Sequence, residues 1–308
     1  MASSSGTTGP LPDPSILEGV TPAPFVRLPD PASLFATRAA RLDRLSQGSD
    51  LAPYLGFLRD IVRVQEAILP ELPEPELPDP AALSLAREHA MPALDRNRFT
   101  ADAAFETTFD RFLAAAEPVA KPEAAQAALA RVASASPAER DGLTRNLLAE
   151  TIPVDAVGEH VYAAAALQVH FTRLAARLDA AALVPVGDAL CPACGGRPAT
   201  SIVVNWPKSH GARYCTCALC GTWWNYVRVR CTACGSTKGI GYQEPEGGQG
   251  AIKAETCDTC NAYCKVLYLP VAHDMEPVAD DVASLGLDLL MREGPYHRAA
   301  FNPFLLGY

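Results

Sequence analysis

Four C-x-x-C pairs gathered in one stretch constrain this chain more than any other feature. All ten cysteines lie between Cys191 and Cys264, and no residue before Cys191 is a cysteine. The pairs are Cys191/Cys194, Cys217/Cys220, Cys231/Cys234 and Cys257/Cys260. In a reducing compartment such spacing indicates metal ligation or redox chemistry, whereas a disulfide framework requires an export route.

The pairs recur with a fixed period. Cys191 and Cys231 are separated by the same number of residues as Cys217 and Cys257. We call this number of residues the repeat period. Each half reads C-x2-C-x22-C-x2-C, and an apolar β-type segment follows it. The pattern predicts an internal duplication, with two tandem rubredoxin-like or zinc-ribbon-like β-modules over residues 186–230 and 231–272.

Each pair is followed by a residue that tolerates a positive φ angle. Gly195, Gly221 and Gly235 follow three pairs and Asn261 follows the fourth, as metal-binding knuckles require. The repeat predicts one site made of Cys191, Cys194, Cys217 and Cys220 and a second made of Cys231, Cys234, Cys257 and Cys260. A cross-brace, in which the first pair joins the third, is the competing arrangement.

The metal is not decided by the ligands. Four thiolates at about 2.3 Å in a tetrahedron suit zinc and also mononuclear iron. Four labile dithiols of thioredoxin type are a weaker interpretation, because such motifs open a helix and these lie in glycine-rich turns. Cys215 and Cys264 stand outside the pairs, and we expect both to pack as small hydrophobic side chains.

Residues 16–185 carry the pattern of a helical domain, after a disordered start at 1–15. Ser33 is the predicted N-cap of a first helix. Apolar stripes at helical spacing follow it: Phe35, Leu42 and Leu45; Leu51, Leu55, Leu58, Val62 and Leu69; Phe105, Phe109, Phe112 and Leu113; Leu167, Phe171, Leu174 and Leu178. The proline-rich segment 70–80 predicts an extended connector. His89, His160 and His170 are interpreted as surface or core residues.

The last segment, 273–308, predicts one more helix and a tail. Asp280 is the predicted N-cap, Val282, Leu285 and Leu289 form a docking face, and Gly294-Pro295 ends the helix. The fold class predicted for the whole chain is therefore α+β: an N-terminal helical domain, two tandem four-cysteine β-modules and a C-terminal helix.

Charge and composition narrow the function classes. The net charge of −9 argues against a general nucleic-acid or membrane-surface binder. The segment 223–230 alternates as a strand, with Trp224, Tyr226, Arg228 and Arg230 on one face. We interpret that face as contacting a partner or another domain, although aromatic residues with arginine also suit nucleic acid. We recognise neither a signal peptide nor a membrane-spanning segment in the sequence, so we expect a cytoplasmic protein.

These residues resemble the FdhE family of formate dehydrogenase accessory proteins. The resemblance is carried by residues 24–33 (PFVRLPDPAS), 51–55 (LAPYL), 190–195 (LCPACG), 217–220 (CALC), 227–235 (VRVRCTACG), 276–285 (EPVADDVASL), 287–291 (LDLLM) and 302–306 (NPFLL). Cys215 and Cys264 depart from the aliphatic residues expected there. The resemblance implies a cytoplasmic protein that binds the catalytic subunit of respiratory formate dehydrogenase before export, with iron at the cysteine pairs.

The expected function is thus a non-enzymatic assembly factor with no catalytic residues and no organic cofactor. A homodimer is an open expectation. Two alternatives remain at this point: a redox-active iron oxidoreductase that acts on the client enzyme, and a zinc ribbon that binds nucleic acid.

Overall fold

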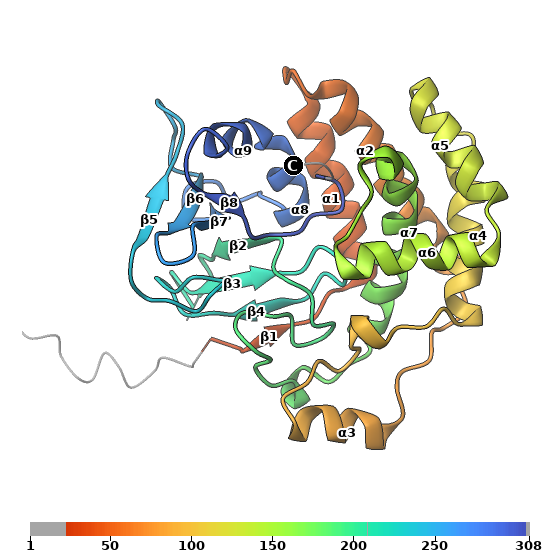
Figure 1. Cartoon of the computed structure of the whole chain (residues 1–308), viewed down its shortest axis with the longest axis horizontal. Coiled ribbons are helices and arrows are strands. Elements are labelled where there is room, and N and C mark those ends of the chain that lie inside the picture. The colour runs from red at the N-terminus through yellow and green to blue at the C-terminus, as the bar shows by residue number, and fades with distance from the viewer. Residues whose placement is uncertain (1–22, 208, 306–308) are drawn as a thin grey trace, which may run out of the picture.

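The computed structural model describes residues 23–207 and 209–305, so the segment 1–15 lies outside the described residues. Figure 1 shows a helical body on one side and a β-sheet on the other. The helices are α1 (Pro31–Ser46), α2 (Ala52–Ile68), α3 (Pro80–Glu88), α4 (Ala103–Ala116), α5 (Glu123–Ser134), α6 (Pro137–Ala149), α7 (Val157–Ala176), α8 (Pro277–Ala283) and α9 (Leu285–Met291). Short 3-10 turns are η2 (Leu69–Glu71), η3 (Arg96–Arg98), η4 (Val154–Ala156) and η5 (Ala180–Ala182).

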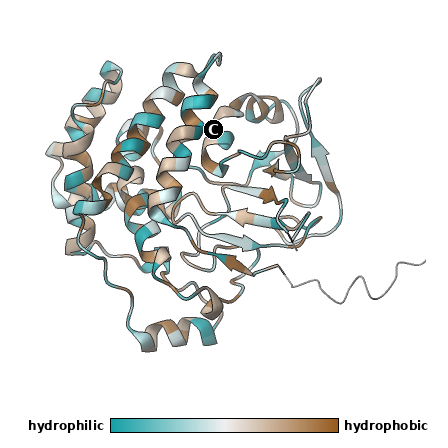
Figure 2. Cartoon of the chain, turned by 180° about the vertical axis from the view of Figure 1, so that it is seen from behind, coloured by the Kyte–Doolittle hydropathy of each residue, from teal (hydrophilic) through white to brown (hydrophobic). Residues whose placement is uncertain are grey.

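Helix α7 is the centre of the helical body. It packs against α1, α2, α4, α5 and α6, and most of its residues are buried. The run Ala163–Ala166 has small side chains, so neighbouring helices can approach closely. At Gly158 a Cβ atom would lie 2.9 Å from the Cβ of Ala128 in α5. Figure 2 shows hydrophilic and hydrophobic bands alternating along the helices, as expected where one side of each faces the core.

The predicted helical stripes are largely buried, but one predicted boundary is wrong. Helix α1 starts at Pro31 with Asp30, not Ser33, as its N-cap. A proline at the first position fits a helix start, because its missing N–H would have no partner there. The segment 72–79 has no regular secondary structure, in agreement with the predicted extended connector.

The strands form one mixed sheet. They are β1 (Val26–Arg27), β2 (Thr200–Val203), β3 (Arg213–Thr216), β4 (Trp223–Asn225), β5 (Ile240–Gln243), β6 (Ile252–Cys257), β7 (Ala262–Tyr268) and β8 (His297–Arg298). Their order is β1-β4-β3-β2-β7-β6-β5, with β8 paired to β7. Each predicted module contributes one antiparallel meander, and the parallel pair β2–β7 joins the two.

The repeat period is visible in the strands. Strand β5 starts one repeat period after β2, and β6 and β7 include the counterparts of β3 and β4. The copies differ after the third strand of each meander. The predicted strand 223–230 ends at Asn225. Further along the same segment, Val229 adopts a positive φ of 57°, which a β-branched residue rarely takes. The predicted single strand face of Trp224, Tyr226, Arg228 and Arg230 is therefore wrong.

The C-terminal segment also differs from the prediction. Two short helices replace the single one, and α8 begins after Glu276, whose side chain accepts from the N–H of Ala279. Asp280 is instead buried inside α8 and pairs with Arg41 of α1 at 2.7 Å. Of the predicted docking face, Val282 is buried and Leu285 packs against the core, whereas Leu289 is 47% exposed and Leu287 and Met291 are buried instead.

Buried charges fasten this segment to the sheet. The ammonium of Lys265 in β7 lies 2.5 Å from a carboxylate oxygen of Asp288 and 3.3 Å from one of Asp281. Arg298 pairs with the same two carboxylates at 2.6 Å. The amide of Asn302 donates to Asp281 at 2.9 Å. Two cations thus balance two carboxylates, as buried charges require.

Candidate metal centres

The first four-cysteine cluster is enclosed by protein. The Sγ atoms of Cys191 and Cys220 are 3.6 Å apart, and those of Cys194 and Cys217 are 3.5 Å apart. All four Sγ atoms lie within 4.8 Å of one another, and all four residues are buried. We call this group the inner cluster. It joins the first C-x-x-C pair to the second, which is the arrangement that the repeat predicts and not the cross-brace.

The inner cluster is built on the core of the helical body. Backbone N–H groups of Ala93 and Leu94 donate to the carbonyls of Pro192 and Ala193 in the first knuckle. The side-chain amide of Gln168 in α7 donates to the carbonyl of Ala218 in the second knuckle at 2.8 Å. The cluster therefore lies where the helices and the sheet share one hydrophobic core.

The second cluster has the same geometry at the surface. The Sγ atoms of Cys231 and Cys260 are 3.7 Å apart, and those of Cys234 and Cys257 are 3.8 Å apart. Cys231 and Cys257 are buried, Cys260 is half-buried and Cys234 is exposed. We call this group the outer cluster. Each of its contacts lies one repeat period after the corresponding contact of the inner cluster.

All four knuckles have the backbone conformation that the sequence predicts. Gly195, Gly221, Gly235 and Asn261 have φ angles of 77°, 72°, 70° and 53°. In the first three, the N–H of the glycine donates to the carbonyl of the first cysteine of the pair. The tight turn directs other N–H groups at sulfur: Cys220 N–H donates to Cys217 Sγ at 3.5 Å, and Ala233 N–H to Cys231 Sγ at 3.3 Å.

The titration of the inner thiols shows how closely they interact. Burial raises the pKa values of Cys191 and Cys220 well above their ordinary range. Hydrogen bonds from Cys191, Cys194 and Cys220 hold the pKa of Cys217 well below it. The close sulfur packing therefore favours a thiolate at Cys217, and a bound cation would stabilise thiolates in place of these hydrogen bonds.

Sulfur spacing fits a tetrahedral metal ion. Four ligands at about 2.3 Å from a central ion lie about 3.8 Å from one another. Two Sγ pairs in each cluster are 3.5 to 3.8 Å apart, and all Sγ atoms of a cluster lie within 4.8 Å of one another. A disulfide needs about 2.05 Å, and all ten cysteines are free. Both clusters can hold a metal ion, and the all-sulfur donor set suits zinc or iron equally.

Cys215 and Cys264 belong to neither cluster and are buried side chains. Cys215 is 0% and Cys264 is 2% exposed. Burial raises the pKa of Cys215 to about 12 and that of Cys264 to about 11, so both are neutral thiols at pH 7. They break the repeat, since their counterparts one repeat period away are Glu255 and Trp224.

The histidines take no part in the clusters. His89 is exposed, and His160 is buried with its ring nitrogens bonded to Ala156 and Asn146. His170 is buried among Phe99, Phe105 and Phe171, and burial lowers its pKa to about 4.

Sequence reasoning missed three residues that hold the inner cluster. Thr222 places its hydroxyl 3.2 Å from Cys220 Sγ. Arg96 donates its backbone N–H to the carbonyl of Cys194 and its guanidinium to the end of α6. Gln168 is the third. Only Thr222 carries a signal, because it follows Gly221 directly, and the other two reach the knuckles through tertiary packing.

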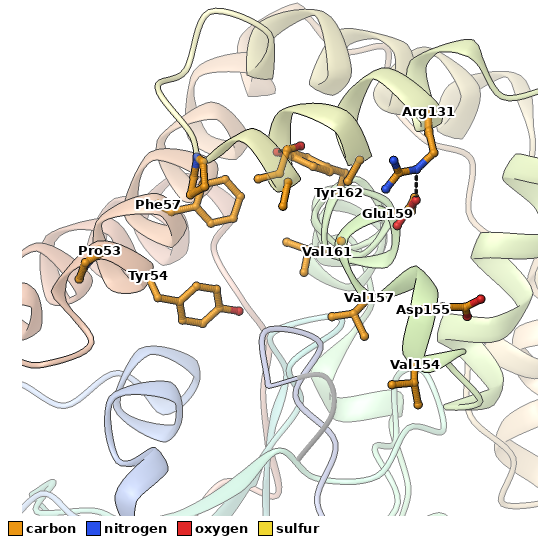
Figure 3. A pocket seen from close by; sticks show the side chains of 15 residues that line it. Pro53, Tyr54, Phe57, Arg131, Val154, Asp155, Val157, Glu159, Val161 and Tyr162 are labelled. Atoms are coloured by element: carbon orange, nitrogen blue, oxygen red, sulfur yellow. Dashed lines mark hydrogen bonds and ion pairs between the residues drawn. The ribbon is translucent and has the colours of Figure 1, made fainter.

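An apolar pocket of about 520 Å³ lies apart from the clusters, between α2, α5 and α7. Figure 3 shows Tyr54 and Phe57 of α2 beside the pocket, across from Val157 and Val161. Arg131 and Glu159 form an ion pair at its rim. The lining is mostly apolar, and we assign no chemistry to it.

Models of one family match the chain over nearly all its described residues. They are the FdhE N-terminal domain at residues 23–188, the central domain at 190–228 and the C-terminal domain at 229–305. The chain belongs to the FdhE family. The inner cluster falls in the central domain and the outer cluster in the C-terminal one.

Curated relatives and a solved structure agree with this assignment. A Protein FdhE homolog of Rhizobium meliloti (strain 1021) is 49% identical over 96% of this chain and 98% of its own length. One from Stutzerimonas stutzeri (strain A1501) is 35% identical over 92% of both chains. The crystal structure of the FdhE protein from Pseudomonas aeruginosa superposes with a TM-score of 0.81 at 32% identity, covering 92% of this chain and 99% of that one.

A membrane-crossing helix is not found within the described parts of the chain, where every helix is too short or too polar.

Proposed function

We propose that this protein is a non-enzymatic maturation factor that binds the catalytic subunit of formate dehydrogenase in the cytoplasm before export. The carrying observation is the pair of four-sulfur clusters built into one sheet, in a chain that resembles FdhE proteins from the helical body to the last described residues. The maturation role itself comes from the family, and the clusters supply the rigid platform it needs.

The eight paired cysteines are the proposed ligands of two metal ions. Iron is the proposed metal and zinc the alternative. When bound, the metal supplies a tetrahedral cross-link between the two knuckles of each cluster. The surrounding residues keep each knuckle in the ligating conformation through the N–H···S contacts and the positive φ angles described above.

Client binding is tested by mixing the purified full-length chain with the catalytic subunit and measuring complex formation by size exclusion. We expect a stable complex with wild type. A Cys191→Ser/Cys194→Ser variant should lose one metal ion, part of its folding and the complex together. Cys215→Ala is the matched control, because Cys215 is equally buried and lies outside the cluster. A metal-depleted variant that still bound the client fully would refute the platform role.

Metal identity is tested by elemental analysis and a visible spectrum after purification without oxygen. About two irons per chain, with thiolate-to-iron charge-transfer bands after oxidation, would support rubredoxin-like centres. About two zincs and no colour would support the same fold as a redox-silent platform.

A redox-active iron protein acting on the client is the second candidate, and the exposed Cys234 favours it because an electron-transfer site needs access. It predicts a spectrum that bleaches with a reductant and recovers with turnover of a partner.

Nucleic-acid binding is disfavoured because Arg230 is engaged by Asp188 at 2.8 Å and by the carbonyl of Gly235. Unchanged gel mobility of DNA and RNA at low salt would remove it. A second copy of the chain as partner is tested by light scattering.

A further inference from the structure

The two clusters differ in solvent access although their sulfur geometry is the same. Every inner cysteine is at most 4% exposed, with Cys191, Cys194 and Cys220 at 0%. In the outer cluster Cys234 is exposed and Cys260 is half-buried. These two thiols belong to different knuckles and contact different partners, so solvent reaches the outer cluster from both of its knuckles.

Only the tips of the outer knuckles are open. Ala233, beside Cys234, is exposed, and so are Asp258 and Thr259 in the fourth knuckle. On the sheet side, Cys231 and Cys257 are covered. An incoming molecule therefore meets Cys234 first and Cys260 second, and it meets the remaining two sulfurs only after these have moved.

The outer knuckles are held in place by contacts that do not involve a metal. The hydroxyls of Ser236 and Thr259 lie 3.0 Å apart and bridge the two knuckles. Arg230 donates to the carbonyl of Gly235 at 3.0 Å, and His297 N–H donates to the carbonyl of Asn261. Strand β6 reaches Cys257 while paired on both sides. The outer knuckles can therefore keep their conformation when one cysteine no longer binds the metal.

The inner cluster has the opposite character. Its knuckles are packed into the helical core, and Gly221 leaves no room for a side chain against Leu34 and Pro29 of the N-terminal segment. A competing ligand would have to part the helices from the sheet before reaching sulfur. Metal release there requires partial unfolding, which is slow.

We propose that the outer cluster is a metal-exchange site for thiol-bearing acceptors, while the inner cluster keeps its metal. This inference rests on the proposed metal binding and adds that metal leaves the protein from the outer cluster. In the exchange, an incoming thiol forms a bond to the metal through sulfur, the bond from the metal to Cys234 breaks, and the proton of the incoming thiol goes to the Cys234 sulfur. No electron is transferred. Repetition at Cys260 frees the metal from its second accessible ligand.

The test uses the full-length chain loaded with zinc and a chromogenic chelator in excess, with glutathione as the thiol. We expect two kinetic phases of one zinc each, the fast one at least tenfold faster than the slow one and accelerated by glutathione. Cys234→Ser should remove the fast phase and leave the slow one. Cys264→Ala is the control, because this buried cysteine lies in the same meander outside the cluster, and it should keep both phases.

A second readout does not depend on variants. Brief alkylation of the zinc-loaded protein, followed by peptide mass spectrometry, should modify Cys234 before any inner cysteine. Release of both zincs at one rate, or earlier modification of the inner cysteines, would overturn the exchange proposal. A wild-type chain that binds fewer than two zincs would instead refute the proposed metal sites, so the two failures are distinguishable.

Discussion

The inner and outer clusters are two copies of one motif placed in different surroundings. Their sulfur contacts recur at the repeat period, and their shortest separations lie between 3.5 and 3.8 Å. The inner copy is surrounded by helices, whereas the outer copy has the sheet on one side and solvent on the other. Local sequence therefore sets the ligand geometry, and tertiary packing sets how tightly each centre is bound to the rest of the fold.

The largest effect is expected from a substitution in the inner cluster. Cys194→Ser should lose about one metal per chain and destabilise the helical body as well, because the cluster shares its core. We expect the loss to exceed about 5 kcal/mol, a large part of the stability of a domain. The outer counterpart Cys234→Ser should lose one metal and leave the main thermal transition nearly unchanged. Thermal melts by circular dichroism check both, and equal losses would contradict the comparison.

The next largest effect concerns a buried ion pair between the two meanders. Arg213 of the first meander lies 2.7 Å from Glu255 of the second, and both side chains are buried. Arg213→Met should cost about 3–5 kcal/mol, because Glu255 would remain as an unpaired buried charge. Its repeat counterpart Lys253 is partly exposed, and Lys253→Met should cost at most about 1 kcal/mol. Urea unfolding of both variants measures the contrast.

A pH effect is expected from the helical body. The pKa of His170 is lowered from 6.5 to about 4 by burial, so the unfolded chain takes up a proton at a higher pH than the folded one. Stability from this residue is complete above pH 6.5 and declines as pH falls toward 4. Between pH 7.5 and 5 the loss is about 2 kcal/mol.

His170→Phe isolates that contribution, because it replaces the ring without adding a titrating group. The difference in unfolding free energy between wild type and variant should change by about 2 kcal/mol between the two pH values. His160→Asn, at a buried position with hydrogen-bonding partners, is the comparison. A wild-type minus His170→Phe difference that stayed constant with pH would refute the assignment.

The smallest expected effect concerns the point where the copies diverge. Val229 adopts φ 57°, at a cost of about 1–2 kcal/mol for a residue with a β-carbon. Val229→Gly should stabilise the chain by about 0.5–1 kcal/mol after the added chain entropy is subtracted. Its repeat counterpart Leu269 is not among the described residues that have a positive φ. Leu269→Gly should therefore destabilise the chain. Chemical denaturation distinguishes the two signs.

The sequence predicts the clusters well because their determinants are local. Cysteine spacing, the residue after each pair and the repeat period together predict which sulfurs meet. The residue ranges 16–185, 186–230, 231–272 and 273–308 stay a proposal for separately folding units. The sharing of one core by the inner cluster and the helices makes the first boundary the one to probe by truncation.

What sequence did not predict depends on contacts between distant residues. The parallel pairing of β2 with β7 merges two modules into one sheet, and no local pattern encodes it. Asp280 resembles an N-cap, but its partner Arg41 lies 239 residues earlier. The segment after Asn225 has the alternation of a strand but does not form one, and there Tyr226 donates its hydroxyl to the carbonyl of Cys231. The unequal exposure of the two clusters arises in the same way.

The most direct test of the two-centre account is native mass spectrometry of the intact chain purified without oxygen, beside Cys234→Ser. We predict two metal ions on the wild-type chain and one on the variant, with the remaining ion resistant to chelator. A wild-type chain without metal, or a variant that still carries two ions, would contradict it.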